Sequence, residues 1–92
     1  MEIFYSPKFA KEYKRLSPQI KKLAERKEII FRQNPHDPRL KTHALQNKLQ
    51  GFWSFSINFQ TRIIFEFIDN NTVGFIQLVP MIFTNSSESF PI

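Results

Sequence analysis

Cysteine is absent from the 92-residue sequence, so neither a disulfide framework nor a thiolate metal site can form. Histidine occurs only twice, and two histidines alone would make a poor metal site. No apolar run approaches the roughly 20 residues that a membrane-spanning helix needs. The opening residues reach proline and charge too early for a secretory signal peptide. The sequence therefore predicts a soluble cytoplasmic protein with no membrane partner.

Basic residues are missing from the end of the chain, because no lysine or arginine follows Arg62. The net charge is nevertheless +5, and nine of the thirteen basic residues lie between Lys8 and Arg32. A basic half beside an aromatic half indicates an anionic partner, either nucleic acid or an acidic protein. A merely well-solvated basic surface explains the charge equally well.

Two Ser-Pro pairs predict a helical hairpin in the first third of the chain. Ser6-Pro7 and Ser17-Pro18 each combine a capping hydroxyl with proline at the first helical position. Apolar residues at helical spacing follow both pairs, so two consecutive helices with a tight joint are expected. The segment 34–42 contains two prolines and turn-forming residues, which predicts a loop.

After Gly51 the apolar residues alternate with polar ones, which is typical of strands. We expect strands over 53–59, 61–68 and 73–79, and Met1–Tyr5 is a short first strand or a lead-in. The helical hairpin should pack on this small antiparallel sheet, which makes the fold class α+β. Ile63, Phe65 and Phe67 should share one sheet face, and the opposite face should carry Arg62, Ile64 and Glu66.

The residues at the end of the chain follow no clear helical or strand period. We therefore divide the chain into a domain of residues 1–79 and an atypical tail of residues 80–92. A loosely docked tail is the simplest interpretation. A frameshift near Leu78–Val79 is a sharper hypothesis. When the reading frame is moved back by one nucleotide, the triplet built on the single codon of Met81 encodes aspartate. The neighbouring triplets then permit the sequence Gly-Thr-His-Asp-Ile-Tyr after Leu78, followed by one more residue and a stop codon.

A family resemblance rests on the segment from Leu40 to Asp69, with its runs RLKTHAL, LQGFWSFSI and TRIIFEFID. These runs, after a hairpin of basic helices, resemble the toxins of the RelE/ParE superfamily, in particular YoeB-like and YafQ-like members. The resemblance covers about the first four-fifths of the chain. Family members commonly end in a G-x-H-x-x-Y strand, which appears here only in the shifted frame.

The resemblance implies an endoribonuclease that cleaves mRNA, free or on the ribosome, without metal or cofactor, and that a cognate antitoxin neutralises. It also implies a sheet of about four strands with two helices on one face. Family members place an acid or base and an aromatic residue on the final strand. Met81 and Phe83 cannot transfer protons, so this chain is expected to be weakened or inactive as an enzyme.

Three residues are the candidates for catalysis. Arg62 matches the arginine of the family strand, and its planar guanidinium suits a phosphate, although a surface pair with Glu66 is the alternative. His43 matches a loop histidine of YafQ-like members, and an imidazole exchanges protons near neutral pH. Glu66 is a second candidate base if it faces the same groove, but pairing with Arg62 is its favoured role.

Three further basic residues are expected to hold the RNA backbone through contacts that weaken with salt: Arg39, Lys41 and Lys48. Trp53 is able to stack on a base, but its alternation with apolar neighbours favours the core. His36 and Asp37 are expected to form a turn. Asn47 stands where the family often has glycine, so the loop geometry is expected to differ.

Two other functions remain open at this point. One is a ParE-like toxin that inhibits DNA gyrase by binding, without nuclease chemistry. The other is a non-catalytic basic module that binds an acidic protein or nucleic acid. The histidine-containing loop around His43 and the strand beginning at Trp53 favour the endoribonuclease.

Overall fold

The computed structural model describes residues 1–80 of the chain. Its elements follow the order of the sequence patterns, with the helices α1 and α2 before most of the sheet. The bounds are β1 Glu2–Tyr5, α1 Pro7–Lys14, α2 Pro18–Gln33, β2 His43–Ala44, β3 Trp53–Ser56, β4 Thr61–Asp69 and β5 Thr72–Pro80. Two short 3₁₀ helices, η1 Pro38–Leu40 and η2 Asn47–Leu49, lie in the loops.

Both helices begin as the Ser-Pro pairs predict. The Ser6 hydroxyl accepts a hydrogen bond from the Phe9 amide at 2.9 Å, and the Ser17 hydroxyl accepts one from the Ile20 amide at 3.3 Å. These bonds satisfy backbone donors that a helix leaves without an internal partner in its first turn. The Ser6 hydroxyl also donates to the Ile76 carbonyl at 2.6 Å, which ties the start of α1 to β5.

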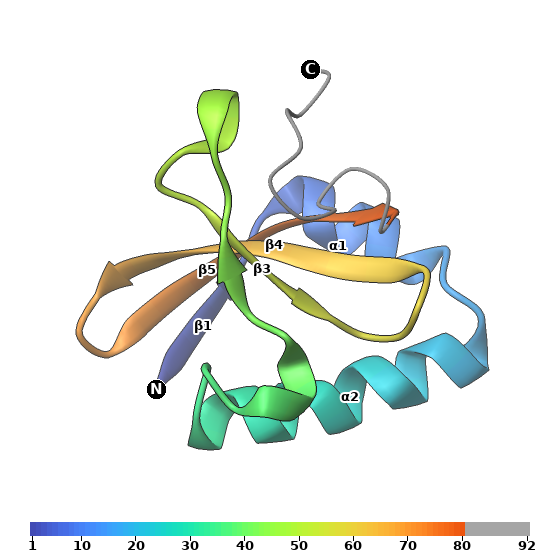
Figure 1. Ribbon diagram of the computed structural model, residues 1–92. Helices are drawn as coiled ribbons and strands as arrows, with labels where there is room; N and C mark the ends of the chain where they lie inside the picture. The colour runs from blue at the N-terminus through green and yellow to red at the C-terminus, as the bar shows by residue number, and fades with distance from the viewer. Residues whose placement is uncertain (81–92) are drawn as a thin grey trace.

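Within residues 1–80, five strands form one sheet in the order β1-β5-β4-β3-β2. The sheet is antiparallel except at β1, which pairs in parallel with β5 through Ile3 and Val73. Helix α2 lies across one face of the sheet, and the loop that carries β2 and η2 rises from the other (Figure 1). The fold class is α+β, as expected.

Phe31 of α2 is the centre of the core between the helices and the sheet. Its fully buried ring packs against Phe55 at 4.8 Å, Phe65 at 4.9 Å and Phe75 at 5.4 Å between ring centroids. Aromatic pairs at such distances add about 0.5–1.5 kcal/mol each beyond the apolar area that they bury. A second, smaller cluster with Ile64 lies on the other sheet face, so β4 alternates as predicted.

The strand predicted over 53–59 ends earlier than expected. Sequence alternation extended it to Phe59, but β3 ends at Ser56, and the Phe59 side chain is 86% exposed. The reason is local, because the Asn58 side-chain oxygen accepts hydrogen bonds from the amides of Gln60 and Thr61, both at 2.8 Å. An asparagine that bonds the following backbone in this way forms a turn and ends the strand.

The domain boundary at residue 79 remains a prediction. Val79 is a buried residue of β5, and Pro80 is the last residue of that strand. The rest of the predicted tail, including Met81 and Phe83, lies outside the described residues. In the part of the chain that is described, no helix is both long and apolar enough to cross a membrane.

Candidate functional site

Arg62 occupies the middle of the sheet. It lies opposite Ser56 on β3 and opposite Val79 on β5, so strands cover it on both sides. Because side chains alternate along a strand, Arg62 shares the sheet face of Ile64, away from α2. This is the face over which the loop with β2 and η2 lies (Figure 1). The predicted orientation of Arg62 is therefore confirmed.

The guanidinium of Arg62 is buried, with the residue only 2% exposed. Its Nε donates to the Ser54 hydroxyl at 3.0 Å, and one Nη donates to the Lys41 carbonyl at 2.6 Å. Burial lowers the pKa of Arg62, because it disfavours the charged form. An arginine starts so far above neutrality that the side chain keeps its charge. A surface pair with Glu66 is therefore wrong as a description of Arg62.

Lys41 is a backbone partner of the site. It ends η1 in the left-handed region, with φ 52° and ψ 44°, which a residue with a side chain adopts at a cost. The preceding Leu40 is fully buried and holds this turn against the core. As a result the Lys41 carbonyl points at the Arg62 guanidinium, while the Lys41 side chain is exposed.

His43 completes the site at the start of β2. Its Nδ1 lies 3.2 Å from an Nη of Arg62 and also 3.2 Å from the Lys41 carbonyl oxygen. A guanidinium only donates and a carbonyl only accepts, so Nδ1 satisfies one of these contacts at a time. With its proton on Nε2 the ring accepts from Arg62; with a proton on Nδ1 it donates to the carbonyl that Arg62 also uses. The proton position on His43 is thus coupled to the hydrogen bonds of Arg62.

Glu66 is not brought into this group. It lies on the same strand and the same face as Arg62, but four residues further along the chain. At the rise per residue of a strand, this places the two residues about 13 Å apart. Its cross-strand neighbour on β5 is Gly74. Of the three residues predicted for catalysis, the fold brings Arg62 and His43 together and leaves Glu66 apart.

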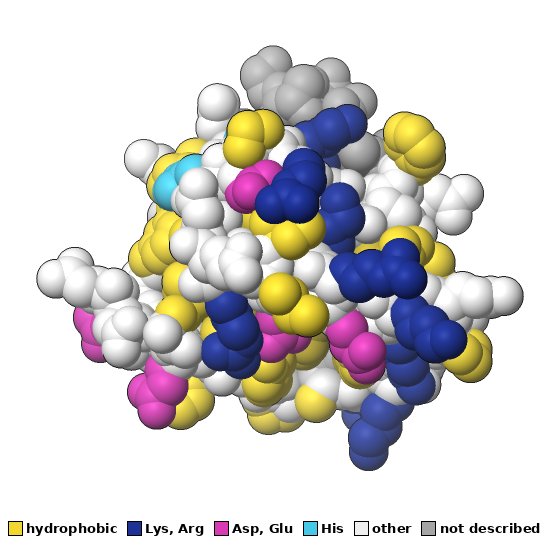
Figure 2. Space-filling view, turned by 90° about the horizontal axis from the view of Figure 1, so that it is seen from below, with side chains coloured by type: hydrophobic (Ala, Val, Ile, Leu, Met, Phe, Trp, Pro, Cys, Tyr) yellow, Lys and Arg dark blue, Asp and Glu magenta, His cyan; other side chains and the backbone are white. Residues whose placement is uncertain are grey.

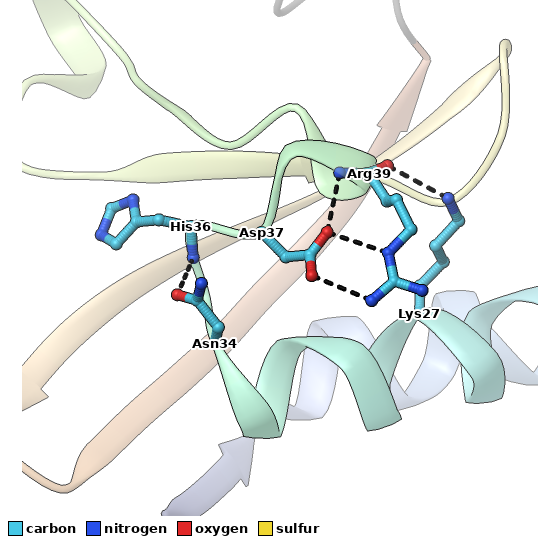
Figure 3. Close-up of polar contacts among 5 residues, drawn as sticks. All are labelled: Lys27, Asn34, His36, Asp37 and Arg39. Atoms are coloured by element: carbon cyan, nitrogen blue, oxygen red, sulfur yellow. Dashed lines mark hydrogen bonds and ion pairs between the residues drawn. The ribbon is translucent and has the colours of Figure 1, made fainter.

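Arg39 is exposed, but its guanidinium is held by a neighbouring acid (Figure 3). Nε and one Nη of Arg39 donate to the two carboxylate oxygens of Asp37, at 3.0 and 2.9 Å. The Asp37 carboxylate also accepts from the Arg39 amide at 2.9 Å, so the turn role expected of Asp37 is present. Lys27 of α2 donates to the Arg39 carbonyl at 3.2 Å, which fastens η1 to the helix.

The pair of Asp37 and Arg39 predicts an acid-dependent loss of stability. The side-chain and backbone hydrogen bonds from Arg39 lower the pKa of Asp37 from 3.8 to about 2. A lowered pKa stabilises the folded state at pH values above the unfolded pKa, and this contribution disappears as the pH falls toward about 2. We expect the difference in free energy of unfolding between wild type and Asp37→Asn to be constant near neutral pH and to shrink below about pH 4. Urea unfolding at a series of pH values measures it, and a difference independent of pH would contradict the assignment.

Lys48 and Asn47 lie in η2, in the loop above the same sheet face. Asn47 has φ 58°, the left-handed conformation that glycine adopts most readily and asparagine next. Asn47 thus adopts a conformation that glycine also favours, and the expected difference in loop geometry remains a prediction. The predicted contact of Lys48 with RNA remains a prediction.

Two residues have roles that sequence patterns did not show. Ser54 is one of the polar residues that alternate with apolar ones after Gly51, and its buried hydroxyl accepts a hydrogen bond from Arg62. In the structure Ser54 lies opposite Ile64, so it shares the sheet face of Arg62 on the neighbouring strand. His36 stacks on Phe67 with ring centroids 5.9 Å apart and meets the Trp53 edge at 5.4 Å, which goes beyond a turn role. Trp53 packs against the core, as expected.

Metal-binding groups are sparse in the described part of the chain. Among residues 1–80, no three histidine, aspartate or glutamate side chains are arranged to hold a metal ion. The candidate site is instead built from one guanidinium, one imidazole, one hydroxyl and one carbonyl oxygen.

Comparisons with solved structures place this fold among bacterial toxins. A YoeB/ParE toxin from Agrobacterium tumefaciens is 15% identical, with a TM-score of 0.74 over 87% of this chain and 98% of that one. YafQ from Escherichia coli is 20% identical, with a TM-score of 0.65 over 88% and 93%. The YoeB–YefM complex from Staphylococcus aureus is 20% identical, with a TM-score of 0.71 over 86% of this chain and 94% of that one. No family model and no curated protein matches the sequence. The chain therefore has the fold of the YoeB and YafQ toxins.

Proposed function

We propose that this chain is the toxin of a type II toxin–antitoxin pair and acts in the cytoplasm as a metal-independent endoribonuclease on mRNA. The observation that carries the proposal is the contact between Arg62 and His43, on a fold that solved YoeB and YafQ toxins share. Fold alone does not define a reaction, so the residues of the site carry the chemical argument.

Cleavage of RNA by its own 2′-hydroxyl needs a group that takes the proton, a group that protonates the leaving oxygen, and positive charge near the phosphate. His43 is partly exposed and is the proposed proton carrier. Its Nδ1 faces Arg62, and its Nε2 is the nitrogen that we propose exchanges the proton with a substrate. The RNA phosphate would meet the exposed Lys41 side chain.

The burial of Arg62 favours a different role from the one that the sequence predicted. A residue that is 2% exposed is not positioned to grip a phosphate directly. We propose that Arg62 is a positioning residue: it fixes the His43 ring and the Lys41 carbonyl and places a permanent positive charge behind the imidazole. Because of its distance from Arg62 along β4, Glu66 is given no role in this proposal.

An antitoxin partner follows from the same proposal. YoeB of Staphylococcus aureus was solved with YefM, and YafQ of Escherichia coli with DinJ. In this chain the Lys8–Arg32 segment carries nine basic residues, and dark blue lysine and arginine side chains gather on the α2 side of the molecule (Figure 2). An acidic segment of a cognate antitoxin would complement this surface.

The proposed frameshift bears on activity. Val79 lies opposite Arg62, and residues directly opposite in an antiparallel pair point to the same face. In the alternative ending the histidine stands at position 81, two residues beyond Val79. Because alternate residues of a strand share a face, a β5 continued with that ending would carry the histidine on the Arg62 face. We propose that the chain as given is weakened for this reason.

The test compares the chain as given with a variant that ends Gly-Thr-His-Asp-Ile-Tyr after Leu78. Each is incubated with mRNA, with and without ribosomes, and separately with DNA gyrase. Cleavage that appears or rises with the alternative ending supports the proposal, provided that one 2′-deoxynucleotide at the cut position blocks it. Gyrase inhibition without cleavage would assign a ParE-like toxin. Neither effect in either form would leave a basic binding module.

A further inference from the structure

Phe59 stands out on the surface because of its position. It lies at the turn between β3 and β4 and is 86% exposed. The turn itself is well held: the Asn58 side chain bonds two following amides, and the Ser56 hydroxyl donates to the Asn58 carbonyl at 2.7 Å. A single exposed apolar residue needs no explanation in general. Here, however, a hydrogen-bonded turn presents an aromatic ring beside a basic cleft.

The cleft runs between α2 and this turn and has a volume of about 300 Å³. Three basic residues line it: Lys27 lies on α2, Arg39 lies in η1, and Lys41 follows η1 directly. No acidic residue is among the described residues that line the cleft. The opposite wall consists of Ser56, Ile57, Asn58 and Phe59. A cavity of this size is at the lower end of the range for small-ligand sites and suits one nucleotide.

The three basic side chains of the cleft differ in how much charge and how many donors they offer to a ligand. Arg39 is neutralised in part by Asp37, so it contributes little charge to a ligand. The Lys27 ammonium has three N–H donors, of which the bond to the Arg39 carbonyl uses one. The Lys41 side chain is exposed at the cleft, while its carbonyl bonds Arg62. Lys27 and Lys41 are therefore the donors that suit a phosphate.

We infer that this cleft binds a nucleotide of single-stranded RNA next to the cleaved bond, with its base stacked on Phe59 and its phosphate at Lys27 and Lys41. The inference rests on the proposed function and adds a second binding position to it. Lys41 joins the two positions, because its backbone belongs to the Arg62 site and its side chain to the cleft. Stacking on an aromatic ring requires an unpaired base, so single-stranded RNA is the favoured substrate.

The test measures binding rather than cleavage. A fluorescent single-stranded oligonucleotide of 2′-O-methyl RNA, which has no 2′-hydroxyl to attack the phosphate, is titrated with the full chain. Phe59→Ala should weaken binding about ten-fold, the effect typical of losing one base–aromatic stack. Phe59→Trp should keep or restore affinity. Phe4→Ala is the matched control, because Phe4 is 58% exposed on β1, at the far edge of the sheet.

An oligonucleotide with abasic sugars separates stacking from charge. Phe59→Ala should not change its binding, whereas Lys27→Gln should weaken the binding of both oligonucleotides. Equal affinity of wild type and Phe59→Ala for the normal oligonucleotide would overturn the inference and leave the proposed function intact. Phe59-dependent binding, together with no cleavage of ordinary RNA by the chain with the alternative ending, would support the cleft and count against the nuclease. If Phe59→Ala changes only self-association in sedimentation, the ring belongs to a protein contact and the inference fails.

Discussion

Replacing Arg62 with alanine is expected to destabilise the protein and to abolish RNA cleavage. Alanine would leave the Ser54 hydroxyl and the Lys41 carbonyl without the donor that the buried guanidinium supplies. Buried polar groups left unpaired cost about 1–3 kcal/mol each, and the space of the lost side chain adds to this. We expect the free energy of unfolding to fall by about 3 kcal/mol or more. Urea unfolding followed by circular dichroism measures the change.

Two controls separate the position of Arg62 from its charge. Arg26→Ala removes the same charge from the exposed surface of α2, and it should change stability little. Arg62→Lys keeps the charge at the site but lacks the planar fork that reaches Ser54 and Lys41 together. It should fold with reduced stability and cleave poorly. A stability of Arg62→Ala within error of Arg26→Ala would contradict the structural role of the guanidinium.

His43→Gln is expected to remove cleavage while leaving the fold intact. Glutamine can still form hydrogen bonds in the loop but cannot take up and release a proton near neutral pH. General acid–base catalysis by one side chain contributes about 10²–10⁴-fold in rate, and a loss of that order is predicted. His43 is only partly buried, so the thermal unfolding midpoint should move little. Single-turnover cleavage of a defined mRNA fragment, using the chain with the alternative ending, measures the effect.

Glu66→Gln is the matched control for His43→Gln, since it too replaces an ionisable side chain with an amide. The separation of about 13 Å along β4 predicts that its cleavage rate stays near that of wild type. A loss with Glu66→Gln as large as that with His43→Gln would move proton transfer to the glutamate. It would show that the folded site differs from the one described here.

Local chemistry explains which parts of the fold were predictable. The starts of both helices follow from Ser6-Pro7 and Ser17-Pro18, because a cap and a proline act within one turn. The orientation of Arg62 follows from alternation along a strand. The parallel pairing of β1 with β5 was not predictable, because it joins residues about 70 positions apart in the chain and no local pattern encodes such a partner.

The candidate site was predictable in part of its residues but not in its geometry. Arg62 and His43 were both selected, yet a buried guanidinium was not expected, since its burial depends on Ser54 and on the loop above it. The left-handed Lys41 has no sequence signal of the kind that glycine gives. Phe59 was assigned to a strand because its alternation was regular, and the turn at Asn58 overrode that pattern.

The central claim is that Arg62 acts through His43. The most direct measurement is a double-mutant cycle on the cleavage rate, with Arg62→Lys, His43→Gln and both changes in the chain with the alternative ending. Residues that act as one unit are not additive, so the double variant should be no slower than His43→Gln alone. Losses that multiply in the double variant would mean that the two side chains act independently, and this account of the site would be wrong.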